Sequence, residues 1–289
     1  MHHARFIIFL TITLFYSIQS YGSTDFALIQ QQGQLANDTY LPPTELEAAL
    51  KLQEQVLIHQ NIMPGSNVSY FLSRSQGAQT LSIRGTANLE NALVDLNLSL
   101  RDNKTLNIKL HQGFASAAVA VYNDVQPFLD LNEPIYITGH SLGGAIAVIL
   151  GMYLSLEDAQ ISQIVTFGQP KVTNVTGANA FSQLPLIRVV NQSDIVPLVP
   201  PISPMQIKDL DIFWHMGSEI ILNGSNEFSI TSGIKSALRA TKFTTSIPNQ
   251  ANLIAHKMDT YLTHISQLRK GAVEVPYKMG IDLFGVSID

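Results

Sequence analysis

The chain has 289 residues, of which 46% are hydrophobic and only 13% are charged, which is enough apolar material to build one large core. The formal net charge of −5 is scattered along the chain, so the clustered basic residues of a nucleic-acid-binding protein are absent. Because there is no cysteine, disulfides, cysteine nucleophiles and thiolate metal sites are excluded.

The first segment has the organisation of a secretory signal peptide. A basic stretch, Met1–Arg5, precedes an apolar run, Phe6–Ile18, and Ser20 and Gly22 then form a small-x-small cleavage pattern. We expect residues 1–22 to be removed by cleavage after Gly22, which gives a secreted or periplasmic protein. An uncleaved membrane anchor is the less favoured alternative, because a bilayer span needs ~20 apolar residues.

The mature chain is expected to open with an irregular lead-in and to continue as a single domain. Residues 23–41 are rich in Gln, Ala and Asn and form the lead-in, whereas residues 42–289 form the domain, including a C-terminal tail. Apolar residues from Leu46 to Leu57 recur at helical spacing after two prolines, which predicts a helix. His59 is expected near the end of this helix in a structural role.

Two strands, residues 68–73 and 80–84, are predicted next. The second strand ends at Gly85-Thr86. In serine hydrolases a loop after an early strand supplies one donor of the oxyanion hole, so the N–H of Thr86 is expected to be that donor. By its local sequence alone, this loop would be an ordinary turn. Residues 89–98 have the mixed pattern of a short amphipathic helix, which would lie beside the site as a lid.

A predicted strand–turn–helix unit carries the candidate nucleophile. The β-branched and aromatic run Ile135–Thr138 predicts a buried strand, and the Ala/Ile/Leu-rich run 145–156 predicts a helix. Between them lies Gly-x-Ser-x-Gly, residues 139–143. Such a turn presents the Ser141 hydroxyl at the sheet edge and directs the Leu142 N–H toward a developing oxyanion. An ordinary Gly-rich turn is the alternative, but the flanking strand and helix favour the nucleophile.

The candidate acid follows a later strand. Residues 163–167 and 186–191 are predicted strands, and the second runs directly into Asp194. An acid at the carboxyl end of a parallel strand lies on the same sheet edge as the nucleophile. The other downstream acids occupy less suitable positions, a helix end or a polar loop: Asp158, Asp209 and Asp211. Asp194 is therefore the expected catalytic acid, with a turn cap before Pro197 as the alternative.

Two histidines satisfy the order Ser, then acid, then His that this fold requires. His256 is preferred to His215 because it directly precedes the last predicted helix, on a loop that could reach the serine. His264 lies inside that helix and is the third choice. His111 lies at a strand end upstream of the nucleophile and is expected to be a hydrogen-bonded structural residue.

Taken together, these motifs resemble the class-three, fungal-type lipase family. The elbow alone is shared by many hydrolases, whereas the ordered set is specific, and it covers residues 44–268. The motifs are Ile-Arg-Gly-Thr (83–86), His-x-Gly-Phe (111–114), Gly-His-Ser-Leu-Gly-Gly-Ala (139–145), Thr-Phe-Gly-Gln-Pro-Lys-Val (166–172), Asn-Gln-Ser-Asp-Ile-Val-Pro (191–197), Trp-His-Met-Gly-Ser-Glu (214–219) and His-x-x-x-x-Tyr-Leu (256–262).

The resemblance implies an α/β-hydrolase fold with a mostly parallel central sheet flanked by helices in one domain. It implies a triad of Ser141, Asp194 and His256, an oxyanion hole from Thr86 and Leu142, and a lid near residues 87–93. Many fungal members carry a lid Trp and stabilising disulfides, whereas residues 88–91 contain no aromatic and the chain has no cysteine.

We therefore expect a secreted serine lipase that hydrolyses fatty-acyl esters, triacylglycerols or related acylglycerols, through an acyl-enzyme. It would act at a lipid interface, with transient contact to a membrane surface, and would need no metal or organic cofactor. Phospholipase A1 and a feruloyl-type esterase acting on soluble esters are the competing enzyme interpretations. A catalytically inactive lipid-binding protein on the same fold is the non-enzyme interpretation. The tail, residues 271–289, is expected either to pack on the core or to meet a membrane or partner surface.

Overall fold

The computed structural model describes residues 24–85, 99–201, 206, 208, 211–233, 236, 249–277, 281–283 and 286–288. Within them, a nine-stranded sheet has the order β1-β2-β3-β6-β7-β9-β11-β12-β13. Its strands are β1 (Val56–Ile62), β2 (Ser69–Ser75), β3 (Ala78–Ile83), β6 (Ile135–His140), β7 (Ile161–Phe167), β9 (Leu186–Asn191), β11 (Ser218–Gly224), β12 (Glu227–Thr231) and β13 (Val273–Glu274). The central run from β3 to β11 is parallel throughout.

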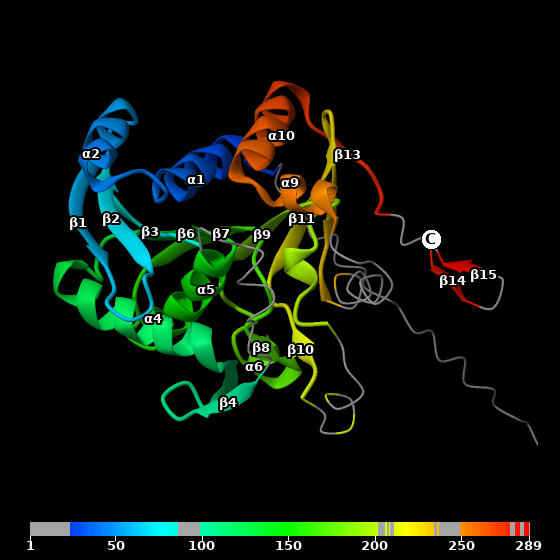
Figure 1. Ribbon diagram of the computed structural model, residues 1–289, viewed down its shortest axis with the longest axis horizontal. Coiled ribbons are helices and arrows are strands. Elements are labelled where there is room, and N and C mark those ends of the chain that lie inside the picture. The colour runs from blue at the N-terminus through cyan, green and yellow to red at the C-terminus, as the bar shows by residue number, and fades with distance from the viewer. Residues whose placement is uncertain are drawn as a thin grey trace, which may run out of the picture.

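Helices cover both faces of this sheet (Figure 1). One face carries α1 (Phe26–Asp38), α2 (Pro43–Leu52), α9 (Gln250–His256) and α10 (Met258–Gly271), and the other carries α4 (Gln112–Val125) and α5 (Leu142–Ser155). A smaller sheet has the order β10-β8-β5-β4 and lies near α6 (Val175–Ala180). Its strands are β10 (Phe213–Trp214), β8 (Thr173–Asn174), β5 (Ile108–His111) and β4 (Leu100–Asn103). Two 3-10 turns, Gln126–Phe128 and Val196–Leu198, and a hairpin of β14 (Ile281–Leu283) and β15 (Val286–Ile288) complete the described elements.

The hydrophobic core has one part on each face of the sheet. Helix α5 is buried from Gly143 to Leu154, as expected for a helix that is apolar on all sides. It packs with α4 against β3, β6 and β7. On the opposite face, α1 and α10 cover β7, β9 and β11. The predicted α/β fold, with a mostly parallel sheet between two helical layers in one domain, is confirmed.

The predicted irregular lead-in is wrong, because α1 occupies most of it. Asp25 caps this helix by accepting hydrogen bonds from the Ala27 and Leu28 N–H groups. Phe26 and Ile29 are buried at helical spacing, and the Gln residues between the apolar positions are good helix formers. The segment therefore belongs to the core layer, and the fold begins before residue 42.

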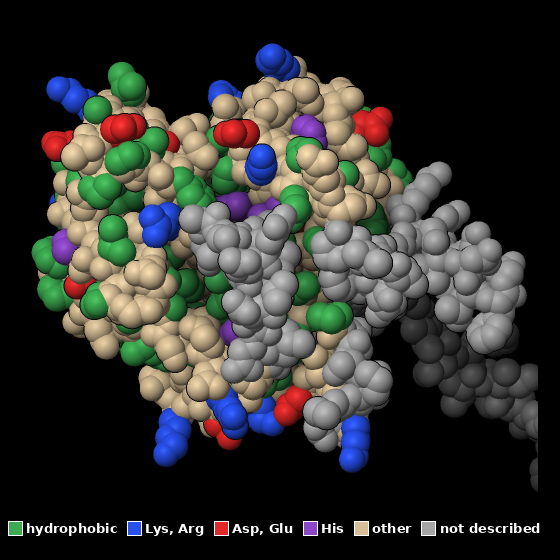
Figure 2. Space-filling view, in the orientation of Figure 1, with side chains coloured by type: hydrophobic (Ala, Val, Ile, Leu, Met, Phe, Trp, Pro, Cys, Tyr) green, Lys and Arg blue, Asp and Glu red, His purple; other side chains and the backbone are tan. Residues whose placement is uncertain are grey.

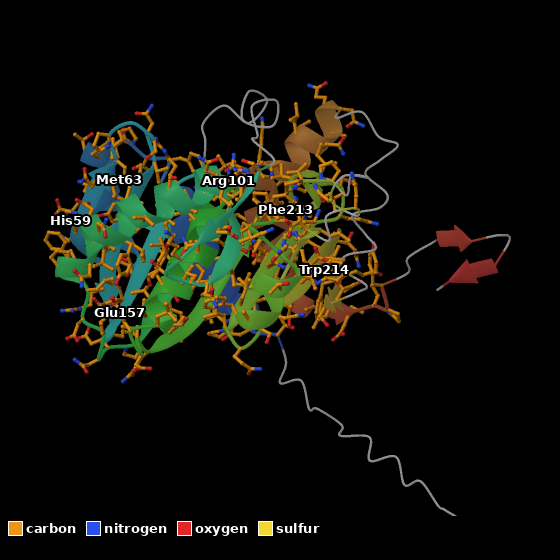
Figure 3. The ribbon with its side chains drawn as sticks, turned by 90° about the horizontal axis from the view of Figure 1, so that it is seen from below. His59, Met63, Arg101, Glu157, Phe213 and Trp214 are labelled. Carbon is orange, nitrogen blue, oxygen red and sulfur yellow. The ribbon has the colours of Figure 1, made fainter. Side chains whose placement is uncertain are left out.

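The predicted helix over residues 44–57 extends too far. Helix α2 ends at Leu52, and Glu54 adopts a left-handed conformation with φ of 56°, which a helix does not tolerate. The chain then enters strand β1. His59 consequently lies on this edge strand, at the outer side of the molecule (Figure 3), with its Nε2 3.1 Å from the Asp124 carboxylate.

No helix among the described segments combines the length and the apolar character needed to cross a membrane. The signal peptide, its cleavage site after Gly22 and the predicted lid over residues 87–93 lie outside the described residues.

Candidate active site

Ser141 lies on a strained turn between β6 and α5. Its φ of 58° and ψ of −128° fall in a region that residues other than glycine adopt only when the surroundings enforce it. The surroundings do so here, because the Ser141 N–H donates to the Phe167 carbonyl at 2.8 Å and its own carbonyl accepts from the Gly144 N–H at 3.0 Å. The side chain is 1% exposed. This is the geometry expected of a nucleophile elbow.

The two motif glycines allow the close approach of strand and helix. A Cβ built on Gly139 would lie 2.5 Å from the Gly143 carbonyl, and a Cβ on Gly143 would lie 2.2 Å from the carbonyl oxygen of Ile83. Both contacts are with backbone, which cannot move aside as a flexible side chain can. The Gly-x-Ser-x-Gly spacing is thus required by packing between β3, β6 and α5.

We expect the substitution Gly143→Ala to lower the free energy of unfolding by about 3 kcal/mol and the melting temperature by roughly 10 °C. The cause is the clash with the β3 backbone. Gly271→Ala is the matched control, since nothing lies within 4 Å of its Cβ position. Thermal unfolding followed by circular dichroism checks both variants. A melting temperature for Gly143→Ala equal to that of the control would contradict this packing argument.

Asp194 is buried in the turn after β9 and accepts several hydrogen bonds. Its Oδ2 accepts from His256 Nδ1 at 2.8 Å and from the Tyr261 hydroxyl at 2.6 Å, and its Oδ1 accepts from the Val196 N–H at 2.9 Å. Burial alone would raise the pKa of Asp194, but the charge of His256 and these hydrogen bonds outweigh it and lower the pKa. Asp194 is therefore an anion that holds the His256 ring.

His256 is the last residue of α9, rather than a loop residue as predicted. A capping box between Asn249 and Asn252 begins this helix, and the Asn252 side chain also donates to the Ser193 carbonyl at 2.8 Å. Near its end, Asn191 donates to the Ala255 carbonyl at 2.7 Å. Since Asn191 and Ser193 lie just before Asp194 in the chain, both ends of α9 are hydrogen-bonded to the segment that carries the acid, which fixes the His256 ring against Asp194.

Ser141, Asp194 and His256 meet at the end of β7. Gly168 follows Phe167, whose carbonyl holds Ser141, and a Cβ on Gly168 would lie 2.7 Å from the His256 ring and 2.8 Å from the Asp194 carboxylate. Among the described residues, the Ser141 Oγ and the His256 Nε2 are both buried and make no hydrogen bond. Catalytic hydrogen bonds are often long in the absence of substrate. Histidine side chains show at the centre of the face in Figure 2.

The N–H of Leu142 is the first of helix α5, and the side chain of the N-cap residue, Ser141, makes no capping hydrogen bond. The first N–H groups of a helix have no partner within the helix, so the Leu142 N–H is suited to bind an oxyanion. The other predicted donor, Thr86, lies outside the described residues, and β3 ends three residues before it, at Ile83.

The remaining candidate acids and histidines make other contacts. His215 Nε2 donates to the Pro197 carbonyl at 2.7 Å, and His264 Nδ1 lies 2.8 Å from the Asn191 amide oxygen. His111 caps α4, its Nδ1 accepting from the Phe114 N–H. Asp211 pairs with Lys109 at 2.5 Å. Asp158 lies in the turn after α5, and Asp209 lies outside the described residues.

The structure adds a polar residue to this site that the sequence did not single out. Tyr261 contacts Asp194 through its hydroxyl, and that oxygen also accepts from the Asn191 N–H at 3.1 Å. The spacing of five between His256 and Tyr261 in the His-x-x-x-x-Tyr-Leu motif was the available signal. In the described part of the chain, no group of three or more His, Asp or Glu side chains is placed to hold a metal ion.

Comparison with known proteins agrees with this geometry. A family model described as Lipase (class 3) matches residues 80–203. The chain is 35% identical over 151 residues to a lipase of Rhizopus niveus, covering 47% of this chain and 38% of that protein. It is 30% identical over 131 residues to the secreted mono- and diacylglycerol lipase 1 of Fusarium solani, covering 42% of this chain and 39% of that one. The chain thus spans about two fifths of the length of these relatives.

Among solved structures, lipase II from Rhizopus niveus superposes with a TM-score of 0.60 at 28% identity, covering 69% of this chain and 81% of that chain. The fold and the arrangement around Ser141 define an α/β-hydrolase with a serine elbow. Within that class, residues 80–203 match the class 3 lipase family model, and the chain is similar to lipases of that family.

Proposed function

We propose that the protein is a secreted serine carboxylic ester hydrolase that cleaves fatty-acyl esters of acylglycerols. Ser141 is the nucleophile, His256 the general base and Asp194 the acid that orients the base. The observation that carries this proposal is the buried 2.8 Å contact between Asp194 and His256, beside a strained serine. The unpaired Ser141 Oγ and His256 Nε2 are the two atoms that the first step would use.

In the proposed mechanism, His256 Nε2 takes the Ser141 proton as Oγ attacks the ester carbonyl. The Asp194 carboxylate holds the proton on Nδ1 and stabilises the imidazolium that forms. The tetrahedral oxyanion is bound by the N–H groups of Leu142 and Thr86, each worth roughly 3–4 kcal/mol. The imidazolium then protonates the leaving alcohol, and water hydrolyses the acyl-enzyme by the same sequence of steps.

An acylglycerol substrate is supported by the relatives, which are named lipases or mono- and diacylglycerol lipases. Phospholipase A1 activity and hydrolysis of soluble, feruloyl-type esters use the same proposed site and are outcomes of the test below. Secretion through cleavage after Gly22 is part of the proposal, and it is supported by the word "secreted" in the name of the Fusarium solani relative.

The test is hydrolysis of acylglycerols of rising chain length by the purified mature protein, in a concentration series that crosses the solubility limit of each substrate. A phospholipid and a soluble feruloyl ester are assayed alongside. A rate that jumps above the limit supports a lipase acting at an interface. Saturation of the rate below the solubility limit would instead assign the protein as an esterase for soluble substrates. A preference for phospholipid would assign it as a phospholipase A1. Absence of turnover on every ester would favour the lipid-binding protein instead.

The oxyanion hole gives a further prediction. We expect Thr86→Pro, which removes the backbone N–H, to lower kcat by roughly 10²-fold while KM changes much less. Thr86→Ala is the matched variant, because it retains the N–H and loses only the hydroxyl, and it should lose less activity. Steady-state kinetics on a soluble short-chain ester measure both. If Thr86→Pro retained the wild-type kcat, Thr86 would not be an oxyanion donor.

A further inference from the structure

A second histidine lies against the proposed base and has no role in the mechanism above. His140 is the last residue of β6, directly before Ser141, and is only 6% exposed. Its ring centroid lies 4.5 Å from that of His256. Both of its ring nitrogens are engaged: Nε2 lies 2.7 Å from the backbone carbonyl oxygen of His256, and Nδ1 lies 2.8 Å from the Tyr40 hydroxyl. His140 thus connects the nucleophile strand to the backbone of the base.

The partners of His140 determine its tautomer. A carbonyl oxygen can only accept, so the proton is on Nε2 and is donated to His256. In the neutral ring Nδ1 is then the acceptor, and the Tyr40 hydroxyl is the donor. Each hydrogen bond therefore has one direction.

The Tyr40 hydroxyl also lies close to the chain just after β3. A Cβ built on Gly85, the residue before Thr86, would lie 2.7 Å from the Tyr40 hydroxyl oxygen. There is no room for a side chain at this point, since a Cβ on Gly85 would lie 2.5 Å from the His140 carbonyl oxygen and 2.9 Å from Ser141 Cβ. A close contact between Gly85 and Tyr40 and two hydrogen bonds thus connect Gly85 through Tyr40 and His140 to His256.

Both side chains keep one protonation state near neutral pH. Burial, together with the nearby charge of His256, lowers the pKa of His140 to about 3. Burial raises the pKa of the Tyr40 phenol to about 12, although the residue as a whole is 36% exposed. A neutral His140 does not repel the imidazolium that His256 would become during catalysis, so the contact persists through the reaction.

We propose that Tyr40 and His140 are positioning residues. They hold the backbone of His256 and the backbone at Gly85, the residue before the proposed oxyanion donor Thr86, in fixed positions relative to Ser141. This inference rests on the proposed function of Ser141 and His256. Within the described residues neither side chain hydrogen-bonds to the Ser141 Oγ, and the pair acts through the two segments that it joins. A displacement of about 1 Å in such a site can cost roughly 10²-fold in rate.

The test is the variant Tyr40→Phe, which removes one hydroxyl and retains the ring. We expect kcat to fall about tenfold with KM nearly unchanged. The matched control is Tyr70→Phe, because the Tyr70 hydroxyl also makes a partly buried hydrogen bond, to Asp124, on the β2 side of the sheet away from His256. The control should lower the melting temperature at least as much as Tyr40→Phe does and retain the wild-type kcat.

A second pair of variants tests His140 itself. Glutamine can place an amide N–H close to where His140 Nε2 lies, whereas leucine cannot donate. We expect His140→Leu to lose more than about tenfold in kcat and His140→Gln to recover most of that loss. Equal losses in the two variants would show that packing alone matters, and the inference would then be wrong.

The failures of the two proposals are distinguishable. If the wild-type protein hydrolyses an ester and Tyr40→Phe has the same kcat, only the positioning inference is overturned. The same holds if Tyr70→Phe loses as much kcat as Tyr40→Phe. If the wild-type protein neither hydrolyses any ester nor reacts with a fluorophosphonate serine probe, the proposed function falls and the inference falls with it.

Discussion

Replacing Ser141 with alanine is expected to lower kcat for ester hydrolysis by roughly 10⁴-fold or more, because the variant has no nucleophile to form the acyl-enzyme. The folded state should change little. The Ser141 Oγ makes no hydrogen bond among the described residues, so the substitution removes no hydrogen bond to them. The melting temperature should therefore stay within about 2 °C of the wild-type value.

The measurement is an initial rate on a short-chain ester, with labelling by a fluorophosphonate as a second readout. Ser82→Ala is the matched control, since Ser82 is a fully buried serine on β3 whose hydroxyl also has no partner in the described part of the chain. It should retain both activity and labelling. Substantial turnover by Ser141→Ala, or labelling of that variant at another residue, would remove Ser141 from its proposed role.

The parallel core of the fold could be predicted because its signal is local. Runs such as Ile135–Thr138 and Leu186–Asn191 are β-branched and apolar, and strands buried on both faces have this composition. The errors arose where that signal is weak. In α1 the apolar residues are separated by Gln, and at Glu54 a single residue with φ of 56° ends a helical pattern that the sequence alone continues to Leu57.

The candidate site could be predicted in part. Ser141 and Asp194 each follow a strand of the parallel sheet, and parallel topology brings such positions to one edge. The choice between His256 and His215 could not be made with the same force, since both follow Asp194 in the chain. The difference is a matter of contacts: His256 reaches the carboxylate of Asp194, whereas His215 reaches the carbonyl of Pro197.

The hydrogen-bond partners of Tyr261 and His140 could not be predicted from sequence patterns, although the His-x-x-x-x-Tyr-Leu spacing places Tyr261 near His256 in the chain. Tyr261 lies 67 positions from Asp194, and His140 lies 100 positions from Tyr40. A sequence identifies polar residues that will be buried, but the atoms that satisfy one another depend on how α1, α9 and α10 pack over the sheet. Such pairs have no periodicity or fixed spacing from which they can be inferred.

We expect His256→Ala to lower kcat by roughly 10⁴-fold or more, because His256 is the proposed acceptor of the Ser141 proton. His215→Ala should lower kcat by less than about tenfold, since His215 Nε2 donates to the Pro197 carbonyl, whereas His256 contacts the Asp194 carboxylate. The two variants remove the same side chain from two positions that both follow Asp194 in the chain. Kinetics on a soluble ester therefore compare them directly, and a larger loss for His215→Ala would show that the wrong base was assigned.

The variant His256→Ala should also change how the free energy of unfolding depends on pH below neutrality. The folded-state pKa of Asp194 is lowered, so the ionised carboxylate contributes stability at pH values above its unfolded pKa of about 3.9, and this contribution is lost as pH falls through the folded pKa. In His256→Ala the carboxylate retains Tyr261 and Val196 but loses the imidazole, so its folded pKa should rise. The variant should then begin to lose stability at a higher pH than the wild-type protein when unfolding is followed from pH 7 downward. If His256→Ala changed neither the pH at which stability is lost nor kcat, the Asp194–His256 contact would stabilise neither the carboxylate nor the transition state.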